Sequence, residues 1–82
     1  MTVKTLMEMK KEQTAKIKEI HCSDIVSKRL INMGVTKGVK IRYLGNAPLG
    51  DPLLIEARGV YIAIRKSVCE QIIVKDINAK TL

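Results

Sequence analysis

The sequence contains no tryptophan, no phenylalanine and only two tyrosines, Tyr43 and Tyr61. A core must therefore be built from aliphatic side chains, and the aromatic platforms on which nucleic-acid bases stack are nearly absent. The two cysteines, Cys22 and Cys69, are too few to staple a small secreted fold and fit a reducing cytoplasm. Long apolar runs are missing as well: the run at 60–64 has five residues, far below the ~20 that cross a bilayer. We expect no transmembrane segment.

Charged residues occur early in the chain. Glu8, Lys10 and Lys11 precede any apolar stretch long enough for a secretory signal. We therefore predict a cytoplasmic protein. A length of 82 residues allows one small core and leaves no room for the two-lobed sites of most cofactor enzymes. No linker or repeat divides the chain, so we predict a single domain over 1–82, with its core at about 6–77 and short flexible ends.

Five stretches are predicted to be short strands, and in most of them apolar and polar residues alternate as in a half-buried strand. They cover 13–20, 39–43, 53–57, 60–65 and 72–76. Their predicted inward residues are Ala15, Ile17, Ile20, Val39, Ile41, Tyr43, Leu53, Ile55, Ala57, Ile62 and Ile64. A bulge before Ile20 is needed to bring that residue to the inner side. Gly59 provides the tight turn of a hairpin between two of these stretches.

Two short helices are predicted between the strands. Ser23 is a suitable N-cap, Asp24 suits the positive first turn, and Gly34 provides a left-handed stop after about three turns. The inner face of this helix is predicted to consist of Val26, Leu30 and Met33. Further along, Ser67 and Glu70 have the spacing of a capping box that opens a single helical turn.

Strands this short, without the spacing of parallel crossovers, favour a mainly β fold. We predict a small closed antiparallel barrel of about five strands, with one inserted α-helix and a short helical turn before the last strand. The segment 45–52 contains two prolines and two glycines, so it must leave the ladder as an ordered loop. Gly38 marks a further turn before the second strand.

Residues with catalytic or metal-binding chemistry are sparse. The single histidine, His21, adjoins Cys22, but adjacent ligands rarely converge on one ion and the other donors of a zinc site are missing. These two residues are the candidates for direct transition-metal binding, and we expect neither a functional metal site nor a cofactor. Cys69 is expected to be a buried, inert thiol. A nucleophile with a base and an orienting group cannot be assembled, so we predict that the protein is not an enzyme.

The formal net charge is +7, from 15 Lys and Arg against 8 Asp and Glu. A small basic barrel that binds nucleic acid is therefore an alternative function. The basic residues are spread from Lys4 to Lys80, mostly at outward strand positions, which is typical of a solvated surface. We therefore expect an acidic protein partner and no nucleic acid.

Three motifs follow one another in the second half: Ala47-Pro-Leu-Gly-Asp-Pro-Leu53, Ala57-Arg-Gly59 and Ile62-Ala-Ile-Arg-Lys66. Lys28-Arg-Leu30 and Met33-Gly34 precede them. With these motifs the chain resembles, from about Leu6 to Val74, the FeoA family of small accessory proteins in bacterial ferrous-iron uptake. The resemblance implies an SH3-like barrel that binds and modulates FeoB, a membrane permease with a GTP-binding domain. It implies a location peripheral to the inner membrane through that partner, and no iron-binding residue.

One departure from the family concerns Lys11 and Glu12, which stand where the family usually has Pro-Gly, so this turn must form without glycine's freedom. The C-terminal barrel of iron-dependent repressors resembles the same family, and a metal-responsive barrel of that kind is the related alternative. We expect no winged helix before residue 1, which argues against that alternative.

The recognition surface is predicted around the loop 45–52. Leu49 is the candidate anchor, because Pro48 and Pro52 hold the loop in a fixed pose; the alternative is that Leu49 caps the barrel mouth. A basic rim around the loop is predicted from Lys28, Arg29, Arg58 and Arg65. The residues with a structural role in the motif are Gly34, Gly38, Pro48, Gly50, Asp51, Pro52 and Gly59. Oligomeric state and any effect on GTP hydrolysis stay open.

Overall fold

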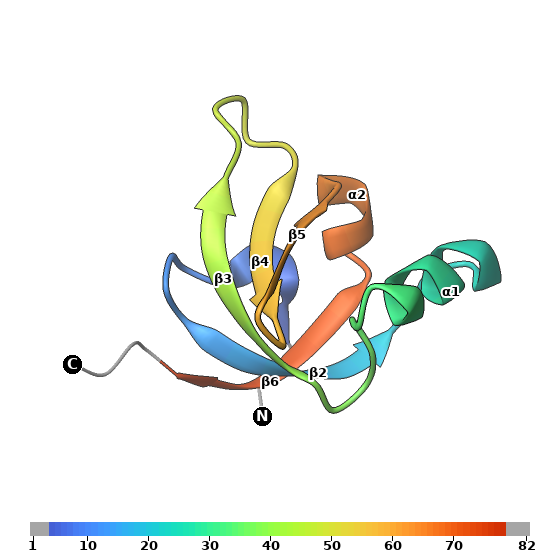
Figure 1. Ribbon diagram of the computed structural model, residues 1–82. Helices are drawn as coiled ribbons and strands as arrows, with labels where there is room; N and C mark the ends of the chain where they lie inside the picture. The colour runs from blue at the N-terminus through green and yellow to red at the C-terminus, as the bar shows by residue number, and fades with distance from the viewer. Residues whose placement is uncertain (1–3, 79–82) are drawn as a thin grey trace.

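One antiparallel sheet of six strands organises residues 4–78, which are the residues described by this computed structural model (Figure 1). The strands are β1 (Lys4–Thr5), β2 (Thr14–Ile20), β3 (Lys40–Asn46), β4 (Leu53–Ala57), β5 (Val60–Ile64) and β6 (Ile72–Asn78). The helical segments are the 3-10 turn η1 (Leu6–Glu8) and the helices α1 (Asp24–Asn32) and α2 (Lys66–Cys69). The predicted mainly β fold, with one inserted helix and a helical turn before the last strand, is confirmed. The predicted flexible ends extend outside the described residues.

The strand order is β1-β6-β2-β3-β4-β5, so β1 and β5 are the edges of the sheet. The sequence predicted five strands in a closed barrel. The structure has six strands within residues 4–78, and no ladder there joins β5 to β1. The additional strand, β1, has only two residues, too few to show an alternating pattern. The sheet curls around one core without closing (Figure 1).

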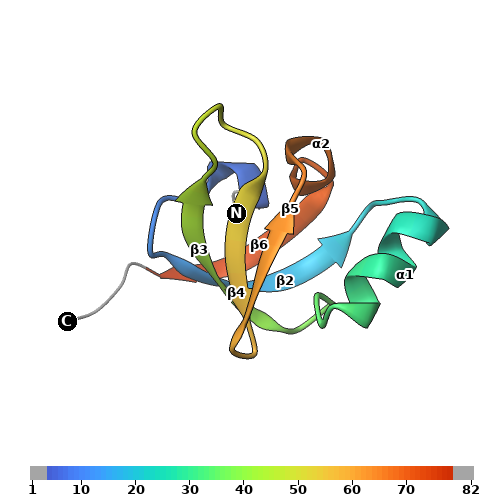
Figure 2. The same cartoon turned by 45° about the horizontal axis from the view of Figure 1, so that its top comes forward.

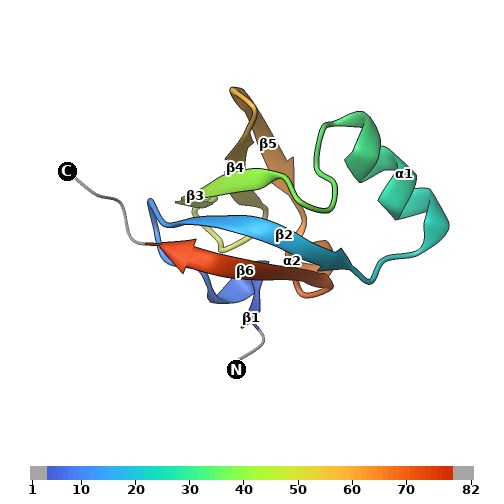
Figure 3. The same ribbon diagram turned by 90° about the horizontal axis from the view of Figure 1, so that it is seen from below.

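The registers bring the inward residues of successive strands together. Ile55 in β4 lies opposite Ile62 in β5, and both are buried. β2 runs beside β6 (Figure 3), and their register shifts between Ile17 and Glu19. This shift confirms the predicted bulge, which turns Ile20 back onto the core.

The core is aliphatic apart from Tyr43 and Cys69, as the scarcity of aromatic residues requires. Within residues 4–78 no polar or charged side chain is buried. Leu6, from η1, is fully buried, and Met9 is nearly so. These two residues come from a segment for which the sequence predicted no element, so the N-terminal turn is part of the core. The other large, fully buried side chains are Ile17, Val35, Ile41, Ile55, Cys69 and Ile72.

Helix α1 begins as predicted, with the Ser23 hydroxyl accepting a hydrogen bond from the Val26 amide at 3.3 Å. Leu30 is buried and Val26 packs against the core, but Met33 is 42% exposed. The prediction that Met33 faces inward is wrong, because the helix ends at Asn32 and the chain turns away there. α1 lies to one side of the sheet (Figure 1). None of the described helices is long and apolar enough to span a membrane.

Helix α2 begins two residues earlier than predicted and uses a different cap. The predicted N-cap, Ser67, lies inside the helix, whose N-cap residue is Arg65. The amide of Lys66 donates instead to Oδ1 of Asp51 at 2.9 Å. The prediction of a capping box at Ser67 and Glu70 is therefore wrong, because a carboxylate from a distant loop takes that role.

Two turns place side-chain-bearing residues in the left-handed region. Glu12 has φ 72°, so the turn at Lys11 and Glu12 forms without glycine as predicted from the family departure. Arg58 has φ 54° and Gly59 φ 81°, so both central residues of the β4–β5 turn have positive φ, as in a type I′ hairpin. Asparagine or glycine is the usual first residue of such a turn, so an arginine there is a strained choice.

Candidate functional site

The loop between β3 and β4 is ordered by its own backbone and by α2. The amide of Ala47 donates to the carbonyl of Pro52 at 2.9 Å, and the amide of Gly50 donates to the carbonyl of Ala47 at 2.7 Å. The bond from Lys66 to Asp51 ties the loop to α2. This fixed loop projects from one end of the molecule (Figure 2).

Leu49 lies at the tip of this loop, and 97% of its residue surface is exposed to solvent. It therefore does not cap the mouth of the barrel, which was the alternative reading of this residue. Gly50, which follows it, has φ 88° and allows the chain to turn back. A leucine held in solvent by a braced loop loses little conformational freedom when a partner covers it.

The four predicted rim residues do not form one rim. Arg65 lies at the loop end, because β5 ends beside the start of β4. Arg58 lies in the β4–β5 turn, at the opposite end of β4 from the loop (Figure 1). Lys28 and Arg29 are exposed on α1, to the side of the sheet. The structure thus keeps Arg65 with Leu49 and separates Arg58, Lys28 and Arg29 from the loop.

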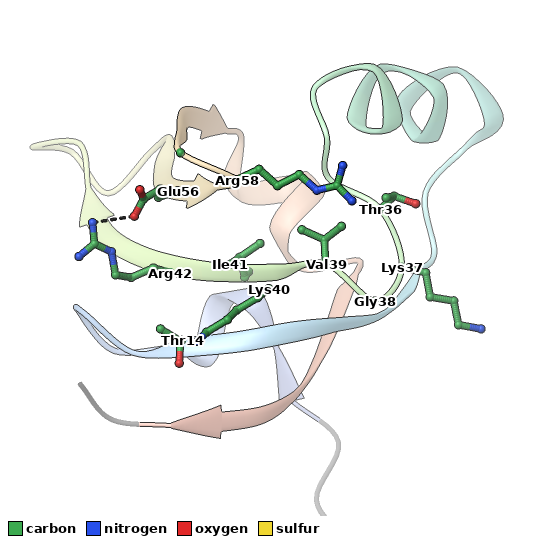
Figure 4. Close-up of a pocket in the computed structure, with 11 residues that line it drawn as sticks. Thr14, Thr36, Lys37, Gly38, Val39, Lys40, Ile41, Arg42, Glu56 and Arg58 are labelled. Carbon is green, nitrogen blue, oxygen red and sulfur yellow. Dashed lines mark ion pairs between the residues drawn. The ribbon is translucent and has the colours of Figure 1, made fainter. Parts of the chain in front are cut away.

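A hollow of about 880 Å³, here the larger hollow, opens at the Arg58 end. The segment 36–38, strand β3 and the β4–β5 turn surround it, and the buried residues Val39 and Ile41 lie at its base. The Arg58 side chain extends across the hollow toward Thr36 (Figure 4). The basic residues that line it are Lys37, Lys40, Arg42 and Arg58. The sequence marked Lys40 and Arg42 as outward residues but gave no sign that they share a hollow.

One of these cations is neutralised within the protein. Nη2 of Arg42 lies 2.7 Å from Oε1 of Glu56, and Nη1 lies 3.6 Å from Oε1 of Glu12. Arg42 therefore ties the left-handed turn at Glu12 to the sheet and is a structural group. Among the described residues, the larger hollow is left with three unpaired cations, Lys37, Lys40 and Arg58.

The candidate metal ligands, His21 and Cys22, lie just after β2. His21 is exposed, and its Nε2 lies 2.8 Å from Oε1 of Glu19. Cys22 is half-buried, and burial raises the pKa of its thiol, which disfavours the thiolate that binds metals. Within residues 4–78 no group of three His, Cys, Asp or Glu side chains is placed to hold an ion. Cys69 is fully buried, and burial raises its pKa to about 12.

Comparison with known proteins identifies relatives over nearly the whole chain. The model of the FeoA domain family matches residues 4–76. FeoA from Chlorobium tepidum is 31% identical with a TM-score of 0.83, and the match covers 87% of this chain and 68% of that one. A FeoA-like protein from Clostridium acetobutylicum is 32% identical with a TM-score of 0.79, over 92% of this chain and 88% of that one.

A third relative carries a functional description. FeoA from Stenotrophomonas maltophilia, solved in complex with zinc, is 25% identical with a TM-score of 0.79, over 95% of this chain and 99% of that one. That protein is described as a procaryotic SH3 domain protein and a proposed activating factor of ferrous iron transport. No curated protein matches the chain. The fold is thus SH3-like, and the match over residues 4–76 shows that the chain belongs to the FeoA family.

Proposed function

We propose that this chain is a non-enzymatic accessory protein of ferrous-iron transport that binds the GTP-binding permease FeoB and modulates it from the cytoplasm. FeoA family membership supports the transport role. The observation that carries the binding role is Leu49, which is 97% exposed on a loop fixed by three hydrogen bonds. An exposed leucine on a rigid support has the properties of an interface anchor, since its burial gains apolar contact at little entropic cost.

The loop end supplies more than one contact group. Arg65 lies beside the start of α2, which the loop caps through Asp51. A cation next to an apolar anchor suits a partner surface that is apolar at its centre and acidic at its rim. The inner membrane location then follows from the partner and requires no anchor in this chain.

The test is a titration of the protein with the isolated cytoplasmic domains of the permease. We expect Leu49→Asp to raise Kd by about tenfold or more, because it places a charge where an apolar side chain is buried. Leu49→Met, which keeps an apolar side chain, retains most of the affinity. Ile31→Asp, which adds the same charge on α1 at a residue 55% exposed, is the matched control. Equal Kd values for Leu49→Asp and the unchanged protein would rule out this loop as the contact surface.

A further inference from the structure

Three lysines lie in one row across the outer face of the sheet. Lys16 in β2 lies opposite Lys40 in β3 on one side and opposite Lys75 in β6 on the other. All three are exposed, and each has a buried neighbour in its strand, so their side chains point into solvent. Since neighbouring strands are about 4.8 Å apart, the row brings three like charges close together.

This lysine row (Lys16, Lys40 and Lys75) is unfavourable for the free protein. Like charges directly opposite each other on neighbouring strands destabilise a sheet. Within residues 4–78 none of the three takes part in an ion pair. The charge that is spread evenly along the sequence is therefore concentrated by the strand registers. A row that folding stability does not explain points to a ligand of opposite charge.

Two hollows in the protein surface adjoin the lysine row. A smaller hollow of about 400 Å³ is lined by Lys16 and Lys40, together with Asp76. Thr14 and Lys40 line both hollows. We call the two hollows together the basic groove; its lining runs from Lys16 in β2 past Lys40 in β3 to Arg58. Asp76 is the one acidic residue in the smaller hollow, and Glu56 in the larger one is already paired with Arg42.

We propose that the basic groove binds an extended acidic segment of a partner protein, with Lys16, Lys40 and Arg58 facing its carboxylates. The identity of that partner as the permease rests on the proposed function, whereas the chemistry of the ligand does not. Lys37, which lines the larger hollow, and Lys75, which lies opposite Lys16, add to the positive surface.

The distribution of the cations favours a peptide over a phosphate group or a nucleic acid. A phosphate site needs donors that converge on one point, but Lys37 and Arg58 extend in different directions (Figure 4). Single-stranded nucleic acid needs aromatic side chains beside the charges. Tyr43 is buried, and Tyr61, on the edge strand β5, does not line either hollow. Cations that are separated along the strands suit an extended chain that carries several carboxylates.

The experiment is a fluorescence-anisotropy titration with a labelled peptide of about eight residues in which glutamate alternates with serine, long enough to cross the strands. A peptide with glutamine in place of glutamate is the neutral control. We expect the acidic peptide to bind and the neutral one not to. Kd for the acidic peptide should rise roughly fivefold in Lys40→Gln and more than roughly tenfold in the Lys16→Gln, Lys40→Gln double variant.

Lys66→Gln is the matched control, because it removes the same charge from an exposed residue in α2, at the other end of the molecule. Its Kd for the acidic peptide should stay within about twofold of the unchanged protein. Three outcomes would overturn the proposal: no binding of the acidic peptide, the same loss in Lys66→Gln as in Lys40→Gln, or tighter binding of a single-stranded oligonucleotide of equal charge.

This test is separable from the test of permease binding. Leu49→Asp lies outside the basic groove and should leave Kd for the acidic peptide unchanged. A protein that binds the peptide but not the permease would refute the proposed partner and keep the groove. A protein that binds the permease through Leu49 but not the peptide would refute the groove alone.

Discussion

Asp51 joins two segments of the chain that are fifteen residues apart, since its carboxylate accepts the hydrogen bond from the Lys66 amide. We expect Asp51→Ala to lower the free energy of unfolding by about 1 kcal/mol, the usual effect of removing an N-cap. Asp51→Asn should restore most of that loss, because the amide oxygen can accept the same bond. Urea denaturation of the three proteins measures the difference.

Ser67→Ala is the control for this cap. Ser67 has the sequence signature of an N-cap but lies inside α2 and makes no capping bond. Its replacement should change the free energy of unfolding by less than about 0.5 kcal/mol. A loss in Ser67→Ala equal to the loss in Asp51→Ala would show that the local cap operates and the distant one does not.

Cys69 makes the stability of the protein sensitive to alkaline pH. Its pKa is raised from 9.0 to about 12, with burial as the main cause. Unfolding therefore releases a proton between pH 9 and pH 12, and the free energy of unfolding falls by up to about 1.4 kcal/mol per pH unit in that range. Below pH 9 the contribution of the buried thiol is fully present.

Urea denaturation at several pH values from neutral to alkaline checks this effect. The unchanged protein should lose stability more steeply than Cys69→Ala above pH 9, because the variant has no thiol to ionise. Cys22→Ser is the control for the other thiol. Parallel pH profiles of the unchanged protein and Cys69→Ala would contradict a raised pKa at this residue.

At the level of elements, the strands other than β1 were predictable, most of them because apolar and polar residues alternate along them. Ala15 and Ile17 in β2, and Ile41 in β3, are buried as their pattern predicts. The pattern is local, however, and cannot state which residues of neighbouring strands face each other. The lysine row depends on the pairing of Lys16 with both Lys40 and Lys75, which the sequence does not contain. Charges that look dispersed along the chain are adjacent for this reason.

The lysine row predicts a stability gain when its middle residue is neutralised. Lys16→Gln removes two like-charge contacts, so we expect the free energy of unfolding to rise by about 0.5–1 kcal/mol at low salt. The melting temperature should rise by about 2–6 °C, and the gain should shrink as salt screens the charges. Thermal melts at two salt concentrations, with Lys66→Gln as control, test this. An equal gain in Lys66→Gln would assign the effect to net charge alone.

At the level of the whole molecule, the loop that carries Leu49 and the β4–β5 turn that carries Arg58 lie at opposite ends of β4 (Figure 1). β4 has five residues, so it spans about 16 Å at the usual rise of a strand. Arg58→Glu reverses a charge in the basic groove, and Leu49→Asp changes the loop. Each should weaken binding to the permease domains, and their free-energy changes in the double variant should add within about 0.5 kcal/mol. A larger coupling in a calorimetric cycle would show that the two ends bind as one surface.

The prediction of a single basic rim around the loop was wrong for a geometric reason. Arg58 and Arg65 are seven positions apart on one hairpin, which suggested proximity, but a five-residue strand carries them to opposite ends. The cap at Asp51 was missed because a side chain from a loop can replace a local signal without leaving a trace in the capped helix. The loop motif itself was recognised because its two prolines and its glycine–aspartate pair are contiguous in the chain.

The first and last strands are hydrogen-bonded neighbours, since Lys4 lies opposite Val74 and Thr5 opposite Ile73. Strands β1 and β6 thus lie side by side, away from the loop that carries Leu49. A circular permutant that links the original ends by a short flexible spacer, and opens the chain at Gly59, would keep every ladder except the connection between β4 and β5. We expect that sequence joined at this margin of the sheet would leave the loop that carries Leu49 exposed.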